Sequence, residues 1–300
     1  MISSFPFKRA LRSKAVWFSL IVITLFTIIT VFAPLLAPHD PLKWANANFS
    51  LPPMWVDNQS HPGNPEFPLG TDRFGRDILS RLIYGTRTEF LLAVSAVPLA
   101  AIIGTLVGLL AGYAGGLLDT LFVGFSDIIQ SLAGIMFAVI IILIFRNLLS
   151  PSWFHGLVTL VVGFAAVSWV NLARLVRINV MLVKTQLFIE AAVSIGASRG
   201  RIITKHILPN IIHVILVWII NAIPAVILLE ALLGYIGVPI TSATTDNDFT
   251  TISWGGLFFS GRSTLNSNPL ILIIPSIGIL LISISFIFLA DFLKSLSRNE

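Results

Sequence analysis

Two acidic residues lie within or beside long apolar segments of the chain. Asp127 interrupts one such segment, and Glu230 lies near the end of another. Ionisable groups are costly to bury in hydrocarbon, so residues of this kind usually mark a pathway or pair with an opposite charge. Two interpretations are open for each residue. It is either part of a pathway or gate, or it is paired with a basic side chain or placed at an interface.

The zinc-protease motif and the ATP-binding P-loop motif are missing from the sequence. The five histidines, at 39, 61, 155, 206 and 213, show no H-E-x-x-H spacing, and the chain has no cysteine. Neither pattern supports a metal site. No G-x-x-x-x-G-K-[ST] segment is present to bind the phosphates of ATP. We therefore expect no catalytic residue, no metal and no cofactor, and if ATP drives this protein, another chain must bind it.

The composition is that of a membrane protein. Apolar residues make up 56% of the 300 residues and charged residues only 11%, with a mean hydropathy of +0.92. Soluble domains carry roughly 25% charged residues. The net charge of +5 fits cytoplasmic lysines and arginines beside membrane spans. It does not indicate nucleic-acid binding, because the basic residues are not interleaved with aromatic ones.

Six segments are long enough to cross a membrane, which takes about 20 apolar residues for a helix. They are residues 16–37, 89–113, 120–145, 156–173, 211–237 and 269–293. The first exceeds the apolar core of a signal peptide, so we expect it to be a retained helix. The predicted fold is all-α and polytopic: a tail at 1–15, the first helix, a loop at 38–88, a five-helix core at 89–293 and a tail at 294–300.

Basic residues predict how the spans are oriented. Both tails and the segment between the fourth and fifth spans are rich in lysine and arginine, and an even number of spans puts all three on one side. By the positive-inside rule that side is the cytoplasm. The loops at 38–88, which is rich in proline, and at 238–268 are then expected on the outer face.

Residues 186–210 read QLFIEAAVSIGASRGRIITKHILPN and predict a helical elbow. One apolar face is formed at helical spacing by Phe188, Ala191, Ala192 and Ile195. Gly196 is expected to end the first helix with left-handed backbone angles, and Ser198 to cap a second short helix. Pro209 predicts a stop near residue 208. An exposed elbow with an apolar face and a basic flank suits docking into a groove on another protein.

This segment resembles the EAA loop of ABC importer permeases. The resemblance is carried by Glu190-Ala191-Ala192, by Gly196, and by His206-Ile207-Leu208-Pro209-Asn210. It is supported by Leu69-Gly70-Thr71-Asp72, Gly75-Arg76-Asp77, Ala173-Arg174-Leu175-Val176-Arg177, Glu230-Ala231 and Ser253-Trp254-Gly255. A histidine at 206, where the general pattern has isoleucine, is similar to the peptide and nickel branch. Together the motifs most resemble the C-type permease of dipeptide and oligopeptide importers.

The resemblance implies a type I permease fold in the inner (cytoplasmic) membrane and half of a translocation pathway for peptides, with nickel or another small solute as the alternative. It implies four kinds of partner: a homologous permease, two ABC ATPase subunits that hydrolyse the ATP, an extracytoplasmic solute-binding protein and the peptide substrate. The residues expected to meet the ATPase are Phe188, Glu190, Ala191, Ala192, Gly196, Ala197, Arg199, Arg201, His206, Pro209 and Asn210.

The sequence also departs from the family pattern in ways that bear on the substrate. Position 133 is alanine where relatives have a proline, so a kink in the third span is not expected there. The stretch 232–237 differs from the usual Leu-Ser-Phe-Leu-Gly, the last span lacks the Gly-Asp pair that is common in relatives, and residues 243–251 form a longer segment than usual.

Small and polar residues within the spans predict helix contacts. Gly104, Gly108 and Gly112 share one face of the second span, which favours close packing over a direct part in the pathway. Asn171 and Asn221 are expected to form interhelical hydrogen bonds. Two other functional classes stay open: an ion-coupled secondary transporter, which would need charges near span centres and inverted repeats, and an intramembrane enzyme, which would need a catalytic dyad.

Overall fold

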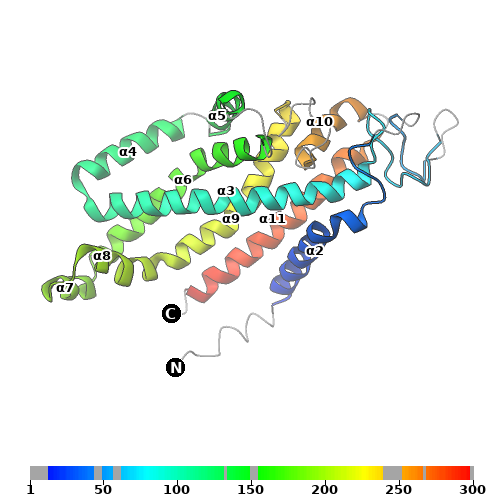
Figure 1. Cartoon of the computed structure of the whole chain (residues 1–300). Helices are drawn as coiled ribbons and strands as arrows, with labels where there is room; N and C mark the ends of the chain where they lie inside the picture. Colours follow the sequence, from blue (N-terminus) through cyan, green and yellow to red (C-terminus); the bar gives the residue numbers. More distant parts are fainter. Residues whose placement is uncertain are drawn as a thin grey trace.

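The computed structural model describes residues 13–43, 49–56, 62–131, 134–148, 155–238, 252–265 and 268–297. These residues form helices and turns, with one isolated bridge between Thr71 and Asp77. Five helices are long and apolar enough to cross a membrane, or six if a bent pair is one span. The long helices lie side by side in a bundle (Figure 1). The predicted all-α, polytopic fold is confirmed.

The long helices are α2 (Lys14–Leu36), α3 (Ile78–Ala114), α6 (His155–Lys184), α9 (Leu208–Ile236) and α11 (Leu270–Ser297). Two of them extend beyond the predicted spans. Helix α3 begins at Ile78, before position 89, because the carboxylate of Asp77 caps it by accepting N–H groups of the first turn. Helix α6 continues past residue 173. Hydropathy marks only the apolar part of a helix, so polar turns at its ends were predicted as loop.

The predicted third span, 120–145, is two helices. They are α4 (Gly116–Ser131) and α5 (Gly134–Leu148), and their axes differ by 93°. Ala133, where the missing proline argued against a kink, lies outside the described residues. The chain nevertheless changes direction between α4 and α5, so the prediction of one continuous helix was wrong. A proline is one cause of a break in a helix, but not a necessary one.

The elbow leads directly into a long helix. It consists of α7 (Leu187–Ser194), α8 (Arg199–Ile202) and a π-helical turn (Ile203–Ile207), after which α9 follows without a gap. The predicted stop before Pro209 was wrong. Proline lacks an N–H, and its ring crowds the carbonyl of residue i−4. The wider π-helical turn, in which the N–H of Leu208 donates to the carbonyl of Ile203, lets the helix pass this position.

Among the described residues, the two larger of three apolar clusters hold most of the helices together. The larger one joins α3, α6, α9 and α11 around the short helix α10 (Trp254–Thr264), with Trp254 almost fully buried. The second lies at the elbow end, where Val176 and Val180 of α6 pack with Ile202, Ile207 and Ile211. The elbow is therefore anchored to the bundle by its own buried side chains.

Candidate functional site

The elbow (residues 186–210) projects at the opposite end of the bundle from the proline-rich lobe, which we define as residues 38–43, 49–56 and 62–77 (Figure 1). Its predicted apolar face is divided. Ala192 is buried with Ile189 against the rest of the chain, so the prediction of one continuous face was wrong for Ala192. The exposed apolar residues of α7 and its C-terminus, which we call the exposed face of the elbow, are Leu187, Phe188, Ala191, Val193 and Ile195.

Two residues of the exposed face are almost fully accessible to solvent. Leu187 is 81% and Ile195 85% exposed. The charged residues Glu190, Arg199 and Arg201 are also exposed, and none of them forms an ion pair with a residue that the structure describes. Apolar and charged groups are thus both available to a partner at this end of the molecule.

Backbone geometry fixes the angle of the elbow. Gly196 has φ +81°, the predicted left-handed conformation, and its N–H donates to the carbonyl of Val193 at 2.9 Å. Ala197, half-buried, donates its N–H to the carbonyl of Ala192 at 3.0 Å. The hydroxyl of Ser198 caps α8 by accepting the N–H of Arg201 at 3.4 Å. Residues 196–200 also have the G-x-S-x-G spacing of the nucleophile turn in α/β-hydrolases. That turn joins a strand to a helix, whereas Ser198 follows one helix and caps another, so Ser198 does not have the position of a hydrolase nucleophile.

The end of the elbow nearest α9 is held by local contacts. The rings of Phe188 and His206 lie 6.4 Å apart between centroids, which links the two arms. The side-chain amide of Asn210 donates to the carbonyl of His206 at 2.5 Å. Pro209 is exposed in the first turn of α9. Some of the predicted elbow residues, such as Phe188 and Glu190, are therefore available to a partner. Others, such as Gly196 and Asn210, determine the shape of the turn.

Asp127 is held by a basic residue of α6. Arg174 forms an ion pair with Asp127 and donates from Nε to the hydroxyl of Ser126 at 2.9 Å. One turn further along α6, Arg177 pairs with Asp119, with Nη2 and Oδ2 2.6 Å apart. The two arginines thus fasten α4 to α6. Of the two interpretations of Asp127, this geometry corresponds to the paired one.

The two asparagines behave differently. Asn171 accepts an interhelical hydrogen bond from Gln130 of α4 at 2.9 Å, as predicted. Asn221 donates to the carbonyl of Val217 in its own helix at 2.8 Å. The predicted interhelical bond of Asn221 was therefore wrong, because the side chain reaches the i−4 carbonyl within α9.

The three glycines of α3 face α6 at close range. A Cβ at Gly104, Gly108 or Gly112 would lie 2.7, 2.5 or 2.8 Å from a backbone oxygen of α6. Such approaches are too short for a real side chain, so the helices pack as closely as they do only because these positions are glycine.

The proline-rich lobe is joined to α3 by two of the motifs noted above, Leu69-Gly70-Thr71-Asp72 and Gly75-Arg76-Asp77. Asp72 is fully buried and pairs with Arg81 of α3 and with Arg76, whose Nη2 lies 2.8 Å from Asp72 Oδ2. Burial opposes ionisation of Asp72, but the guanidinium groups of Arg81 and Arg76 hold the pKa of its carboxyl below the usual value. The lobe is thereby locked onto the start of the helix.

Glu230 belongs to a buried junction at the N-terminus of α10. Its side chain is 1% exposed and lies beside that of Glu89 in α3, which is also 1% exposed. Glu89 was missed because it stands at the edge of a predicted span, where an acid is expected to face water. The signal in the sequence was the position of the two acids, with Glu89 at the start of one apolar run and Glu230 near the end of another.

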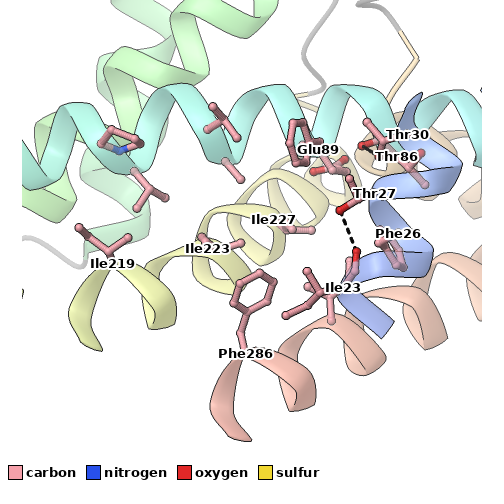
Figure 2. Close-up of a pocket in the computed structure, with 16 residues that line it drawn as sticks. Ile23, Phe26, Thr27, Thr30, Thr86, Glu89, Ile219, Ile223, Ile227 and Phe286 are labelled. Carbon is pink, nitrogen blue, oxygen red and sulfur yellow. Dashed lines mark hydrogen bonds between the residues drawn. The ribbon is translucent and has the colours of Figure 1, made fainter. Parts of the chain in front are cut away.

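A cavity of about 230 Å³ lies beside Glu89, between α2, α3, α9 and α11. Figure 2 shows Glu89 on the same side of this cavity as Thr27, Thr30 and Thr86, while isoleucines such as Ile223 line the remainder. No group of three or more metal-binding side chains occurs among the residues described. The cavity is therefore an apolar space with a single acidic wall residue.

Comparison with known proteins decides the family. Residues 104–298 match the model of the binding-protein-dependent transport system inner membrane component. The chain belongs to this family. Residues 7–53 of the permease also match the N-terminal transmembrane domain of oligopeptide transport permease C. The chain is accordingly a multi-pass membrane subunit and not an enzyme, since in such transporters a partner ATPase hydrolyses ATP.

Curated relatives cover nearly all of the permease. The dipeptide transport system permease protein DppC of Alkalihalophilus pseudofirmus is 33% identical over 96% of this chain and 86% of the relative. DppC of Haemophilus influenzae is 30% identical over 94% and 90%, respectively. The oligopeptide transport system permease protein OppC of the same organism is 29% identical over 96% and 85%. These alignments extend from the first helix to the last.

Proposed function

We propose that the chain is a permease subunit of an ATP-driven peptide importer and that it couples to a separate ATPase through the elbow. The observation that carries the coupling is the exposed face of the elbow, where Leu187 and Ile195 are more than four-fifths exposed at the end of a helical projection. Covering these apolar side chains with a partner lowers the free energy, because it removes apolar surface from water. The basic residues beside them favour a partner with acidic groups at the rim of its groove.

The connection of the elbow to the bundle supports the same role. The second arm of the elbow continues through the π-helical turn into α9, which packs against α3, α6, α10 and α11. A partner that moves α7 and α8 therefore acts on a helix in the centre of the molecule. An ATP-dependent displacement of this kind shifts the permease between two states only if the partner's contacts differ between them.

Peptides are the proposed substrates. The support is that relatives named as dipeptide and oligopeptide permeases align with nearly the whole chain. One relative of similar identity is named as a glutathione permease, and glutathione is itself a short peptide. The assembly proposed is a homologous second permease, two ATPase subunits below and a solute-binding protein on the outer face, in the inner membrane with both termini of this chain in the cytoplasm.

The coupling is tested with substitutions that change only exposed groups. In Leu187→Ser with Ile195→Ser, the apolar surface offered to the ATPase is reduced while nothing buried is altered. Burial of one large aliphatic side chain contributes about 1.5–3 kcal/mol, so loss of one contact weakens binding roughly tenfold to a hundredfold. We expect the double variant to insert normally, to co-purify with less ATPase and to lose peptide uptake in proportion.

The matched control is Gly200→Ala, in the same elbow, where an added Cβ meets nothing within 4 Å. Its co-purification and uptake should equal those of the wild type. Wild-type docking and uptake in the double serine variant would refute coupling through the elbow. ATP-independent, ion-driven peptide transport in proteoliposomes containing only this chain would instead support a secondary transporter.

A further inference from the structure

Two buried carboxyl groups from different helices meet at the N-terminus of α10. Glu89 comes from α3 and Glu230 from α9, and each is 1% exposed. Glu89 Oε1 accepts the N–H of Trp254 at 3.1 Å, and Glu230 Oε2 accepts the N–H of Gly255 at 2.8 Å. The two acids thus bind consecutive N–H groups of one helical turn.

The other N–H groups of this turn are already occupied. Ser253 accepts the N–H of Gly256 with its hydroxyl at 3.0 Å and that of Leu257 with its carbonyl at 3.2 Å. The N–H groups of residues 254–257 are therefore all satisfied. The hydroxyl of Ser253 also lies near the carboxyl group of Glu230, but the N–H groups of residues 254–257 offer neither carboxyl group a further bond.

One oxygen of each carboxyl is left without a donor. Glu89 Oε2 and Glu230 Oε1 are inaccessible to solvent and accept no hydrogen bond from any residue that the structure describes. A buried acceptor without a donor is costly, and two such acceptors on adjacent acids are more so. Both charges would also repel each other in a medium of low dielectric constant.

No cation of the described chain offsets these charges. The nearest elements carry few basic residues, and the contacts of those are elsewhere. Arg81 of α3 pairs with Asp72, and Arg262 of α10 donates to the carbonyl of Tyr235 at 3.0 Å. No ion pair joins either glutamate to the other charged or titratable residues of α2, α3, α9 and α11, which are Lys14, Tyr84, Arg87, Tyr113, His213, Tyr235, Asp291 and Lys294.

Space around the pair is also restricted. A Cβ at Gly255 would lie 2.4 Å from Glu230 Oε1, and one at Gly234 would lie 2.3 Å from the backbone of Gly255. On the side of Glu89, the neighbouring cavity is lined by aliphatic and aromatic side chains and three threonines, and no second carboxylate is among its lining residues (Figure 2). Metal cations need several oxygen ligands, which this site does not supply, whereas a proton needs none beyond the two carboxyl oxygens.

We propose that Glu89 and Glu230 bind one proton between them, so that the pair carries a single negative charge when exposed carboxyl groups are fully ionised. The proton sits between Glu89 Oε2 and Glu230 Oε1, where it supplies the donor that both oxygens lack. The remaining charge faces two N–H groups at the positive end of α10, which stabilise one negative charge. Two adjacent carboxyl groups that hold one proton are a known solution to like-charge repulsion at short range.

The proton binding is tested by infrared spectroscopy of the full-length chain in lipid bilayers. The carbonyl stretch of a protonated carboxyl group is separate from that of a carboxylate, and the band shifts in D₂O. We expect the wild type to show this band at neutral pH, well above the pKa of about 4.3 of an exposed glutamate. Absence of the band in the wild type would overturn the proposal without reference to any variant.

Two isosteric variants assign the band. In Glu89→Gln or Glu230→Gln the amide takes the place of the protonated partner, so the remaining glutamate ionises and the band should disappear in each. Glu66→Gln is the control, because Glu66 is an exposed acid of the proline-rich lobe with 64% of its side chain accessible, and the band should persist. A band that survives either of the first two substitutions means that the two carboxyl groups do not share the proton.

Discussion

At the scale of single residues, Asp72 is the side chain whose loss should cost most outside the bundle core. It is fully buried and is the ion-pair partner of Arg81, which is itself 4% exposed. Removing one member of a buried pair leaves the other charge uncompensated and costs about 3–5 kcal/mol. We expect Asp72→Asn to lower the midpoint of thermal unfolding of the purified chain. Glu66→Gln, at an exposed position of the same lobe, should leave it unchanged.

The same ion pair predicts how stability depends on pH. The pKa of Asp72 is lowered in the folded chain, so its contribution is complete above the unfolded value of about 3.9 and is lost as pH falls through the folded value. The difference in stability between wild type and Asp72→Asn should be constant above about pH 4 and shrink below it. An unfolding midpoint difference that stays constant into strong acid would contradict this assignment.

At the scale of helices, the contact between α3 and α6 depends on glycine. A Cβ at Gly108 would meet the carbonyl oxygen of Ala173 at 2.5 Å, whereas one at Gly124 in α4 would meet nothing within 4 Å. Gly108→Ala should therefore destabilise the chain by about 1–3 kcal/mol through overpacking. Gly124→Ala should stabilise it by up to about 1 kcal/mol, because alanine is the better helix former.

Thermal unfolding and the yield of assembled chain measure both variants. Shifts of opposite sign are the expected result. Equal shifts would mean that α3 and α6 can separate enough to accept a methyl group and that the glycine contact is not needed for assembly.

The helices also show what a single sequence can predict and where it fails. Apolar runs located five long helices, and the turn at Gly196 followed from the lack of a Cβ in a left-handed conformation. The start of α3 depends on the cap at Asp77, and the break after Ser131 lies within a run that is apolar on both sides. The cap is a local contact between a side chain and the backbone, and neither it nor a change of direction within an apolar run is visible in hydropathy.

The candidate site was predictable to a similar extent. The elbow was located by its local pattern, but the burial of Ala192 depends on how α7 packs against the rest of the chain, and the passage of Pro209 depends on the π-helical turn. Glu89 and Glu230 are far apart in the chain, and only the packing of α3 and α9 against α10 brings their side chains together.

At the scale of the whole molecule, the elbow and the proline-rich lobe should lie on opposite sides of the membrane. The chain has no cysteine, so single cysteines can be introduced without background. Glu66→Cys lies in the lobe and Gly200→Cys in the elbow, and both positions are exposed. An impermeant thiol reagent applied to intact cells should label position 66 and not position 200. The reverse pattern would invert the proposed orientation.

Permeabilised cells are the control for this measurement, because both cysteines should then react. A cysteine at 200 that stays unlabelled after permeabilisation would be covered by a partner, and its reaction after the ATPase is removed would identify that partner.

The π-helical turn has a mechanical consequence. Residues 199–236 form one helix of 38 residues, which at about 1.5 Å per residue is a rod of roughly 57 Å. Arg199 stands at one end and Glu230 close to the other, so a torque on the outer arm reaches the carboxyl pair through continuous helix and not through a loop. Had Pro209 ended the helix, a hinge would separate the two. A single tilting lever can therefore link events at the two ends of the molecule, and its backbone hydrogen bonding is weakened at the wide turn and at Pro224.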